Sequence, residues 1–168
     1  MAHCKAAGLS WQDAINGELD FLRGWGLPTP RYGRRLEEEA KRRGAETSMD
    51  LVGQYIWRAA ASFPQARARP SPQYPSRVAP LHIRLTGPND AFVMHHSDIW
   101  HIDYGAALNR SLDFCRNYGL SPDLSAALWV RARSLGNTVR DEVRRILMAA
   151  AEGLPDGDPG RSSASRRQ

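Results

Sequence analysis

The stretch SAALWVRARSLGNTVRDEVRRILMAA, residues 125–150, decides the fold class of this chain. Apolar residues recur every three or four positions on both sides of Gly136, which is the spacing of an amphipathic helix. Ser121-Pro122-Asp123 is typical of a helix start, and Thr138 is a suitable cap for a second helix. The apolar positions are Leu124, Leu128, Ala132 and Leu135 before the glycine, and Val139, Val143, Ile146, Leu147 and Ala150 after it. We therefore predict two helices joined by a tight turn, an amphipathic helical hairpin.

The same helical spacing continues outward from this hairpin. It predicts helices over residues 10–25, 34–43 and 48–62, and one from Tyr104, with Asp103 as N-cap and Gly119 as its stop. LHIRLTG, residues 81–87, instead alternates apolar and polar side chains like a half-buried strand. Residues 87–90 read as a turn, and residues 91–94 as a second short strand. The predicted fold class is mainly α, with amphipathic helical hairpins, one or two short strands and a disordered C-terminal tail.

Proline and charge divide the chain into regions. Five prolines lie between residues 64 and 80, and proline disfavours helix because it lacks the amide donor. We predict a helical N-terminal region (1–63), a Pro/Arg-rich linker (64–80) and an α-rich C-terminal domain (81–151). Residues 152–168, rich in Gly, Pro, Asp, Ser and Arg, are expected to form a disordered tail.

The composition is that of a globular protein with a basic balance. The 168 residues include 23 Lys+Arg and 18 Asp+Glu, a net charge of +5, and only Lys5 and Lys41 are lysines. Arginine suits contacts with phosphates and with guanine edges, although a GC-rich genome gives the same bias. The excess is local, because residues 31–80 hold ten basic and five acidic side chains. No apolar run approaches the ~20 residues of a membrane span, and the first residues lack a signal-peptide core, so we expect a cytoplasmic protein.

The two cysteines exclude one class of fold. Cys4 and Cys115 are too few and too far apart for a disulfide scaffold or a zinc site.

The hairpin resembles the ribbon-helix-helix DNA-binding family, especially the small antitoxins that pair with PIN-domain ribonuclease toxins. The similar pieces are ALWVRARSLG, the turn Gly136-Asn137-Thr138, and DEVRRIL, within roughly 30 residues of the chain. The resemblance implies a dimer whose two-stranded ribbon enters the major groove, with the N-terminus of the second helix at a DNA phosphate. It places Asn137 and Thr138 at that phosphate, and Arg131 and Arg133 on the polar side of the first helix.

The ribbon would have to come from LDFCRNYGL, residues 112–120. Read as a strand, this segment makes Arg116 and Asn117 the base readers. Read at helical spacing, it continues the helix from Tyr104 equally well, and the hairpin is then a plain pair of packed helices.

Histidines form a second constellation. Four of the five lie between residues 82 and 101. His95, His96 and His101 with Asp98 and Asp103 have the side chains of a Zn²⁺ or Fe²⁺ site, and His101 with Asp103 could serve acid–base chemistry. No spacing here matches an established metal motif, and histidines with a structural role are the alternative.

The leading prediction is a dimeric DNA-binding regulator, transcriptional or antitoxin-like, without enzymatic activity or cofactor. Arg116 and Asn117 would read bases, and Arg131, Arg133, Asn137 and Thr138 would hold phosphates. The expected partners are DNA, a second copy and a protein such as a toxin, and no membrane. One alternative is a helical protein–protein module without nucleic acid, whose basic face is solvated. Tryptophans are expected to pack in the core, although Trp129, off the apolar stripe, could face a partner instead. The other alternative is a metal-dependent enzyme that uses residues 95–103.

Overall fold

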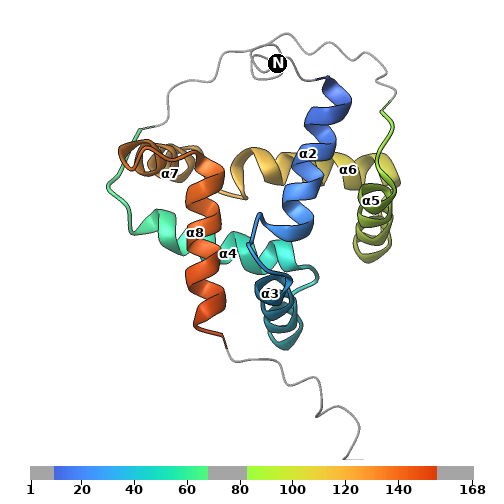
Figure 1. Cartoon of the computed structure of the whole chain (residues 1–168), viewed down its shortest axis with the longest axis horizontal. Helices are drawn as coiled ribbons and strands as arrows, with labels where there is room; N and C mark the ends of the chain where they lie inside the picture. Colours follow the sequence, from blue (N-terminus) through green and yellow to red (C-terminus); the bar gives the residue numbers. More distant parts are fainter. Residues whose placement is uncertain (1–9, 68–82, 155–168) are drawn as a thin grey trace, which may run out of the picture.

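Seven α-helices make up the secondary structure of the computed structural model, which describes residues 10–67 and 83–154. No strand occurs within those two ranges (Figure 1). The helices are α2 (Trp11–Gly24), α3 (Pro30–Arg42), α4 (Ser48–Ala61), α5 (Gly87–Trp100), α6 (Tyr104–Asn117), α7 (Pro122–Ser134) and α8 (Val139–Glu152). The mainly α prediction is therefore confirmed for these residues, and most of the predicted linker and tail lie outside them.

Side-chain caps explain where several helices begin. Ser10, Asp103, Ser121 and Thr138 each accept a hydrogen bond from a backbone N–H of the following helix, which satisfies a donor that has no partner inside the helix. The predicted helix starts at these four residues are confirmed. At the other end, Tyr118 adopts a left-handed backbone conformation (φ 53°) directly after α6.

The two predicted strands are wrong wherever the structure describes them. Residues 83–86 are irregular, residues 81 and 82 lie outside the described part, and the predicted turn at 87–90 and strand at 91–94 belong to α5. Pro88 is tolerated in the first turn of a helix, where its missing N–H costs no bond. Helical spacing then buries Asn89, Val93, His96 and Trp100 on one face. The alternating run at residues 81–87 favoured a strand and a turn and so hid this helical pattern.

Helices from both sides of the proline-rich segment pack together. α8 contacts α3, α4 and α7, while α2 contacts α5 and α6; Figure 1 shows α8 crossing α4, and α2 crossing α6. One hydrophobic cluster joins them, including Leu19, Leu36, Ile56, Val93, Leu128 and Leu147. Among residues 10–67 and 83–154, no helix has both the length and the apolar character needed to cross a bilayer.

A buried polar contact fixes α5 against α2. The Asn89 Nδ2 donates to the backbone oxygen and to the Oδ1 of Asn16, at 3.1 and 3.0 Å. The Asn16 Oδ1 also accepts from the Thr86 N–H at 3.0 Å. Because buried amides are costly without partners, this arrangement specifies how α5 sits, and with it the position of Trp100 at its end.

Candidate functional site

Arg116 and Asn117, the predicted base readers, lie at the end of a helix. Residues 112–117 continue α6, so the strand reading of residues 112–120 is wrong and the helical alternative is confirmed. The physical reason is local: Asp103 caps α6, and Ala107, Ser111 and Cys115 bury one helical face. The Asn117 Oδ1 accepts from the Gly119 N–H at 2.9 Å, so this side chain ends the helix. Arg116 lies 3.9 Å from the Asp113 carboxylate in an exposed pair.

The other four predicted DNA-binding residues lie at the far end of α7 and in the turn that follows. The 13 residues of α7 span about 20 Å, so the two groups are not neighbours. Thr138 forms a capping box with Asp141, in which its hydroxyl donates to the carboxylate at 2.6 Å. Asn137 is exposed, and its backbone N–H donates to the Ala132 carbonyl. Thr138 therefore has a structural role at the start of α8.

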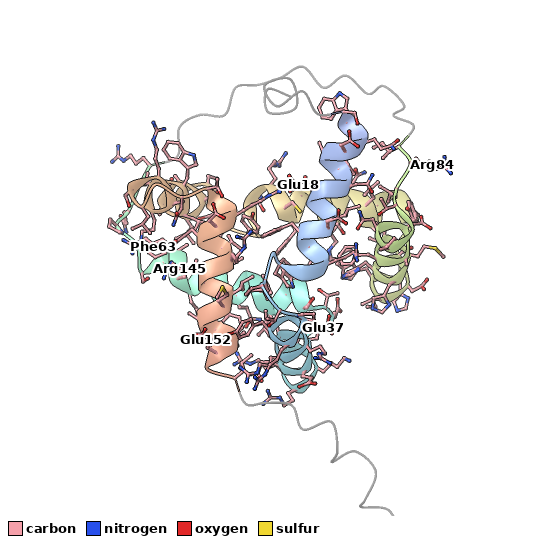
Figure 2. All side chains as sticks on the ribbon, in the orientation of Figure 1. Glu18, Glu37, Phe63, Arg84, Arg145 and Glu152 are labelled. Atoms are coloured by element: carbon pink, nitrogen blue, oxygen red, sulfur yellow. The ribbon has the colours of Figure 1, made fainter. Side chains whose placement is uncertain are left out.

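Arg131 and Arg133, two residues apart on α7, have different surroundings. The Arg131 guanidinium lies 5.7 Å from the centre of the Phe63 ring, and its Nε lies 3.9 Å from a Glu142 oxygen. In Figure 2, Phe63 lies on the same side of the molecule as α7. Arg133 is exposed and lies over the Trp129 ring at 5.1 Å. Arg131 thus links α7 to α8 and to the end of α4, whereas Arg133 points to the outside.

Carboxylates dominate the first turn of α8. Asp141 and Glu142 both lie there, and hydrogen bonds from Thr138 lower the pKa of Asp141 below its ordinary value. Glu142 is fully buried and accepts two hydrogen bonds from Arg145, at 2.9 and 2.5 Å, which lower its pKa. The positive end of this helix therefore already has its own negative charges, and a phosphate placed there would meet both.

Three large apolar side chains on α7 and just after it are exposed. Trp129, which the sequence places off the buried stripe, is 51% exposed, and Val130 and Leu135 are also exposed. Trp129, Val130 and Arg133, which lie within about 100° of one another around α7, form what we call the α7 face. The α7 face therefore leaves an aromatic ring and an aliphatic side chain in contact with water.

The histidine segment is divided between a helix and the turn after it. His95 is exposed on α5, and His101 caps α5 in a left-handed conformation (φ 51°). His96 is buried, has its Nδ1 2.8 Å from the Phe92 carbonyl oxygen and packs on Trp100, and burial lowers its pKa. The Asp103 carboxylate caps α6. No group of three or more metal-ligating side chains gathers anywhere in residues 10–67 and 83–154.

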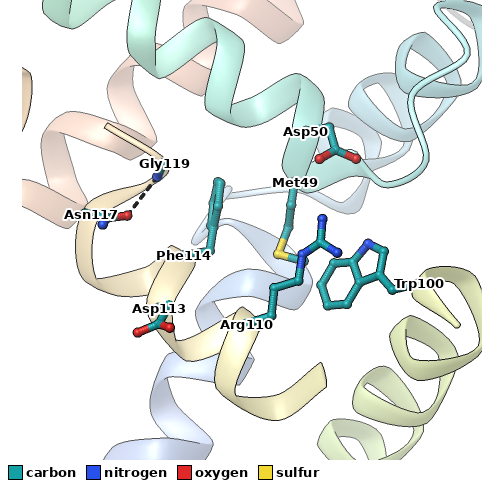
Figure 3. Close-up of a pocket in the computed structure, with 8 residues that line it drawn as sticks. All are labelled: Met49, Asp50, Trp100, Arg110, Asp113, Phe114, Asn117 and Gly119. Carbon is teal, nitrogen blue, oxygen red and sulfur yellow. Dashed lines mark hydrogen bonds between the residues drawn. The ribbon is translucent and has the colours of Figure 1, made fainter. Parts of the chain in front are cut away.

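Trp100 and Arg110, which the sequence analysis did not single out, line a cavity of about 200 Å³ between α4, α5 and α6 (Figure 3). We call it the Trp100 pocket. The Arg110 guanidinium lies 4.1 Å from the centre of the Trp100 ring. The Trp100 Nε1–H is buried without a hydrogen-bond partner among the described residues, which costs about 1–3 kcal/mol. The pocket is lined by Met49, Asp50, Trp100, Arg110, Asp113, Phe114, Asn117 and Gly119.

No short-range sequence pattern marks the Trp100 pocket, since α4 supplies part of its wall from a position far along the chain from the consecutive helices α5 and α6. The similarity of residues 125–150 to ribbon-helix-helix proteins stays a prediction from the sequence alone. No protein-family model, curated protein or solved structure matches the chain.

Proposed function

We propose that this protein is a helical interaction module whose α7 face binds an acidic, partly apolar segment of another protein. The observation that carries the proposal is the exposure of Trp129 and Val130 on the side of α7 where the Arg133 guanidinium lies over the Trp129 ring. Tryptophan and arginine are the residue types most enriched at the energetic centres of protein interfaces. An aliphatic or aromatic side chain of the partner would cover Trp129, and a carboxylate would pair with Arg133.

The charges around the α7 face favour a protein partner over DNA. Binding to DNA draws on several cations that are free to neutralise phosphates. Arg131 lies beside Glu142, which also accepts from Arg145, and Arg144 lies 3.4 Å from Asp141. Arg133, by contrast, has an aromatic ring beside it and no carboxylate partner among the described residues. Arg133 beside exposed apolar side chains therefore suits a partner segment in which a carboxylate lies next to an apolar side chain.

A different protein fits the α7 face better than a second copy of this chain does. In a symmetric dimer the same patch contacts itself, which would bring two copies of the exposed Arg133 into one interface. Like charges at an interface disfavour that pairing. An acidic partner segment has the complementary charge instead.

Peptide selection tests the proposal. A random peptide display library is selected on the protein and counter-selected on the Trp129→Ala variant, and the enriched peptides are measured by fluorescence anisotropy. We expect peptides with Asp or Glu next to Leu, Phe or Trp, whose affinity falls at least tenfold on Trp129→Ala, in line with about 2 kcal/mol for a central interface tryptophan. Arg133→Glu should have a similar effect. Trp11→Ala is the matched control, since Trp11 is 44% exposed on α2.

The alternative from the sequence, a dimeric DNA-binding regulator, is decided in the same experiment. Each variant is also incubated with a 30-base-pair duplex at 50 mM salt. A mobility shift that weakens steeply with salt, and that Arg133→Glu abolishes while Trp129→Ala does not, would replace our proposal by DNA binding. Enriched peptides without acidic residues, or equal binding by wild type and Trp129→Ala, would also overturn it.

A further inference from the structure

We propose that the Trp100 pocket binds a small zwitterion of the chemical class of an apolar or aromatic α-amino acid. This site lies between α4, α5 and α6, so it uses none of the residues of the α7 face. Three parts of its lining carry the inference: two donors, two carboxylates and an apolar wall.

The donors would hold the carboxylate of the ligand. Trp100 is 8% exposed, and its indole N–H has no partner among the described residues. Arg110 stacks on the same ring and has no carboxylate partner in the described part of the chain. Figure 3 shows the indole nitrogen and the guanidinium next to each other, on the side of the ring toward Asp50. One carboxylate can accept from both, and the planar guanidinium suits that group.

The carboxylates of the pocket select against a simple anion. Asp50 and Asp113 line the same cavity as Arg110. One Asp50 oxygen, Oδ2, accepts from Thr47 in the capping box of α4, and no described hydrogen bond uses the other. Asp113 is largely exposed and has only a loose pair with Arg116 at 3.9 Å. A ligand with a carboxylate alone would meet only these negative charges, whereas an ammonium group beside that carboxylate would give an opposite charge to Asp50, which lies on the side of the two donors (Figure 3).

The volume and the apolar wall of the pocket suit a small apolar side chain. Met49 and Phe114 form the apolar wall across the pocket from the Trp100 ring, with Met49 between Phe114 and Arg110 (Figure 3). At about 200 Å³, the cavity lies between the ~150 Å³ that holds a benzene molecule and the ~300 Å³ at which sites for drug-sized ligands begin. A single ring or a short aliphatic side chain fits this space.

Entry to the indole N–H depends on Arg110. The Nε1 atom is closed to solvent, and the exposed Arg110 side chain lies over the ring. The arginine therefore has to shift when the ligand enters, and then contacts its carboxylate. Binding should perturb the Trp100 indole signal more than that of any other tryptophan.

Nuclear magnetic resonance of the full chain tests this site. The five tryptophans give five indole N–H signals, and the Trp100 signal is the one that Trp100→Phe removes. L-phenylalanine, hydrocinnamate and phenethylamine are titrated separately, because the last two lack the ammonium and the carboxylate group respectively. We expect L-phenylalanine to shift the Trp100 signal with saturation, at least tenfold more tightly than either analogue. The Trp129 and Trp11 signals should stay unmoved.

Variants of the exposed Arg110 keep the test independent of folding. Arg110→Gln should weaken L-phenylalanine binding at least tenfold, and Arg110→Lys should restore part of it, since lysine keeps the charge without the two-pronged geometry. Arg116→Gln, on the same helix but outside the pocket, is the matched control and should bind like wild type. No shift with L-phenylalanine, tighter binding of either analogue, or unchanged binding by Arg110→Gln would each overturn the proposal.

Discussion

Replacing Glu142 by glutamine removes the charge from a fully buried carboxylate on α8 while keeping the volume of its side chain. Arg145 donates two hydrogen bonds to this carboxylate, at 2.9 and 2.5 Å, and Arg131 lies 3.9 Å away. We expect Glu142→Gln to fold and to be less stable at pH 7.

The size of the effect follows from these contacts. A hydrogen bond to a charged group contributes about 1.5–3 kcal/mol, and one between neutral groups about 1 kcal/mol. Glutamine keeps one acceptor oxygen, and the half-exposed Arg145 regains water, so the loss stays below the ~3–5 kcal/mol of a fully buried pair. We expect a loss of about 2 kcal/mol in the free energy of unfolding. For a chain of 168 residues, that corresponds to a Tm lower by roughly 4–8 °C.

The pH dependence has a definite sign. Hydrogen bonds from Arg145 hold the folded-state pKa of Glu142 below its ordinary value of 4.5, so the unfolded chain takes up the proton first as the pH falls. The stabilisation is complete above about pH 5 and is lost as the pH drops through the folded pKa. The stability difference between wild type and Glu142→Gln should therefore shrink below pH 4.5.

Urea unfolding followed by circular dichroism measures this difference at several pH values. Asp113→Asn is the matched control, because Asp113 also lies three residues before its arginine but in an exposed pair, worth about 0–1 kcal/mol. Equal stability of Glu142→Gln and Asp113→Asn at pH 7 would show that the buried charge does not stabilise the fold. A difference that is as large at pH 3 as at pH 7 would show that packing, and not charge, causes it.

Two further substitutions and one chemical modification test the capping of α8, the backbone at His101 and the burial of Cys115. Thr138→Ala removes the capping box of α8 and should cost about 1 kcal/mol in urea unfolding. Thr86→Ala is the matched control and should be nearly neutral, because exposed Thr86 precedes α5 without a side-chain capping bond; equal losses would contradict the capping role. His101→Gly should raise the free energy of unfolding by about 0.5–1 kcal/mol in the same assay. Exposed His101 has a φ of 51°, which glycine adopts without strain. A less stable variant would show that the histidine side chain stabilises the fold by more than its backbone strain costs. Burial raises the pKa of the Cys115 thiol, which lowers the fraction of reactive thiolate. Alkylation of Cys115 at pH 8, measured by peptide mass spectrometry, should therefore be much slower in the folded protein than in urea. Equal rates would show that this thiol is accessible in the folded protein.

The predicted helices that the structure confirms share strong local signals. Ser121-Pro122 before α7, Thr138 before α8 and Asp103 before α6 all act within a few residues of the helix they start. Such caps depend on the chemistry of neighbouring residues and hardly on the rest of the fold. The strands predicted at residues 81–87 and 91–94 had no comparable signal: alternation over so few residues fits an irregular segment followed by a helix just as well.

For this protein, the sequence alone determined the helical class and the ends of its hairpins, because capping groups and apolar spacing act locally. Only the tertiary structure decided what the side chains do. It places Arg131 next to the buried Glu142 and Arg133 over the exposed Trp129 ring, although both arginines belong to the same helix. It also brought Trp100, Arg110 and Asp50 around one cavity. The physical reason is that burial and charge pairing depend on which helices meet, and residues distant along the chain make those contacts.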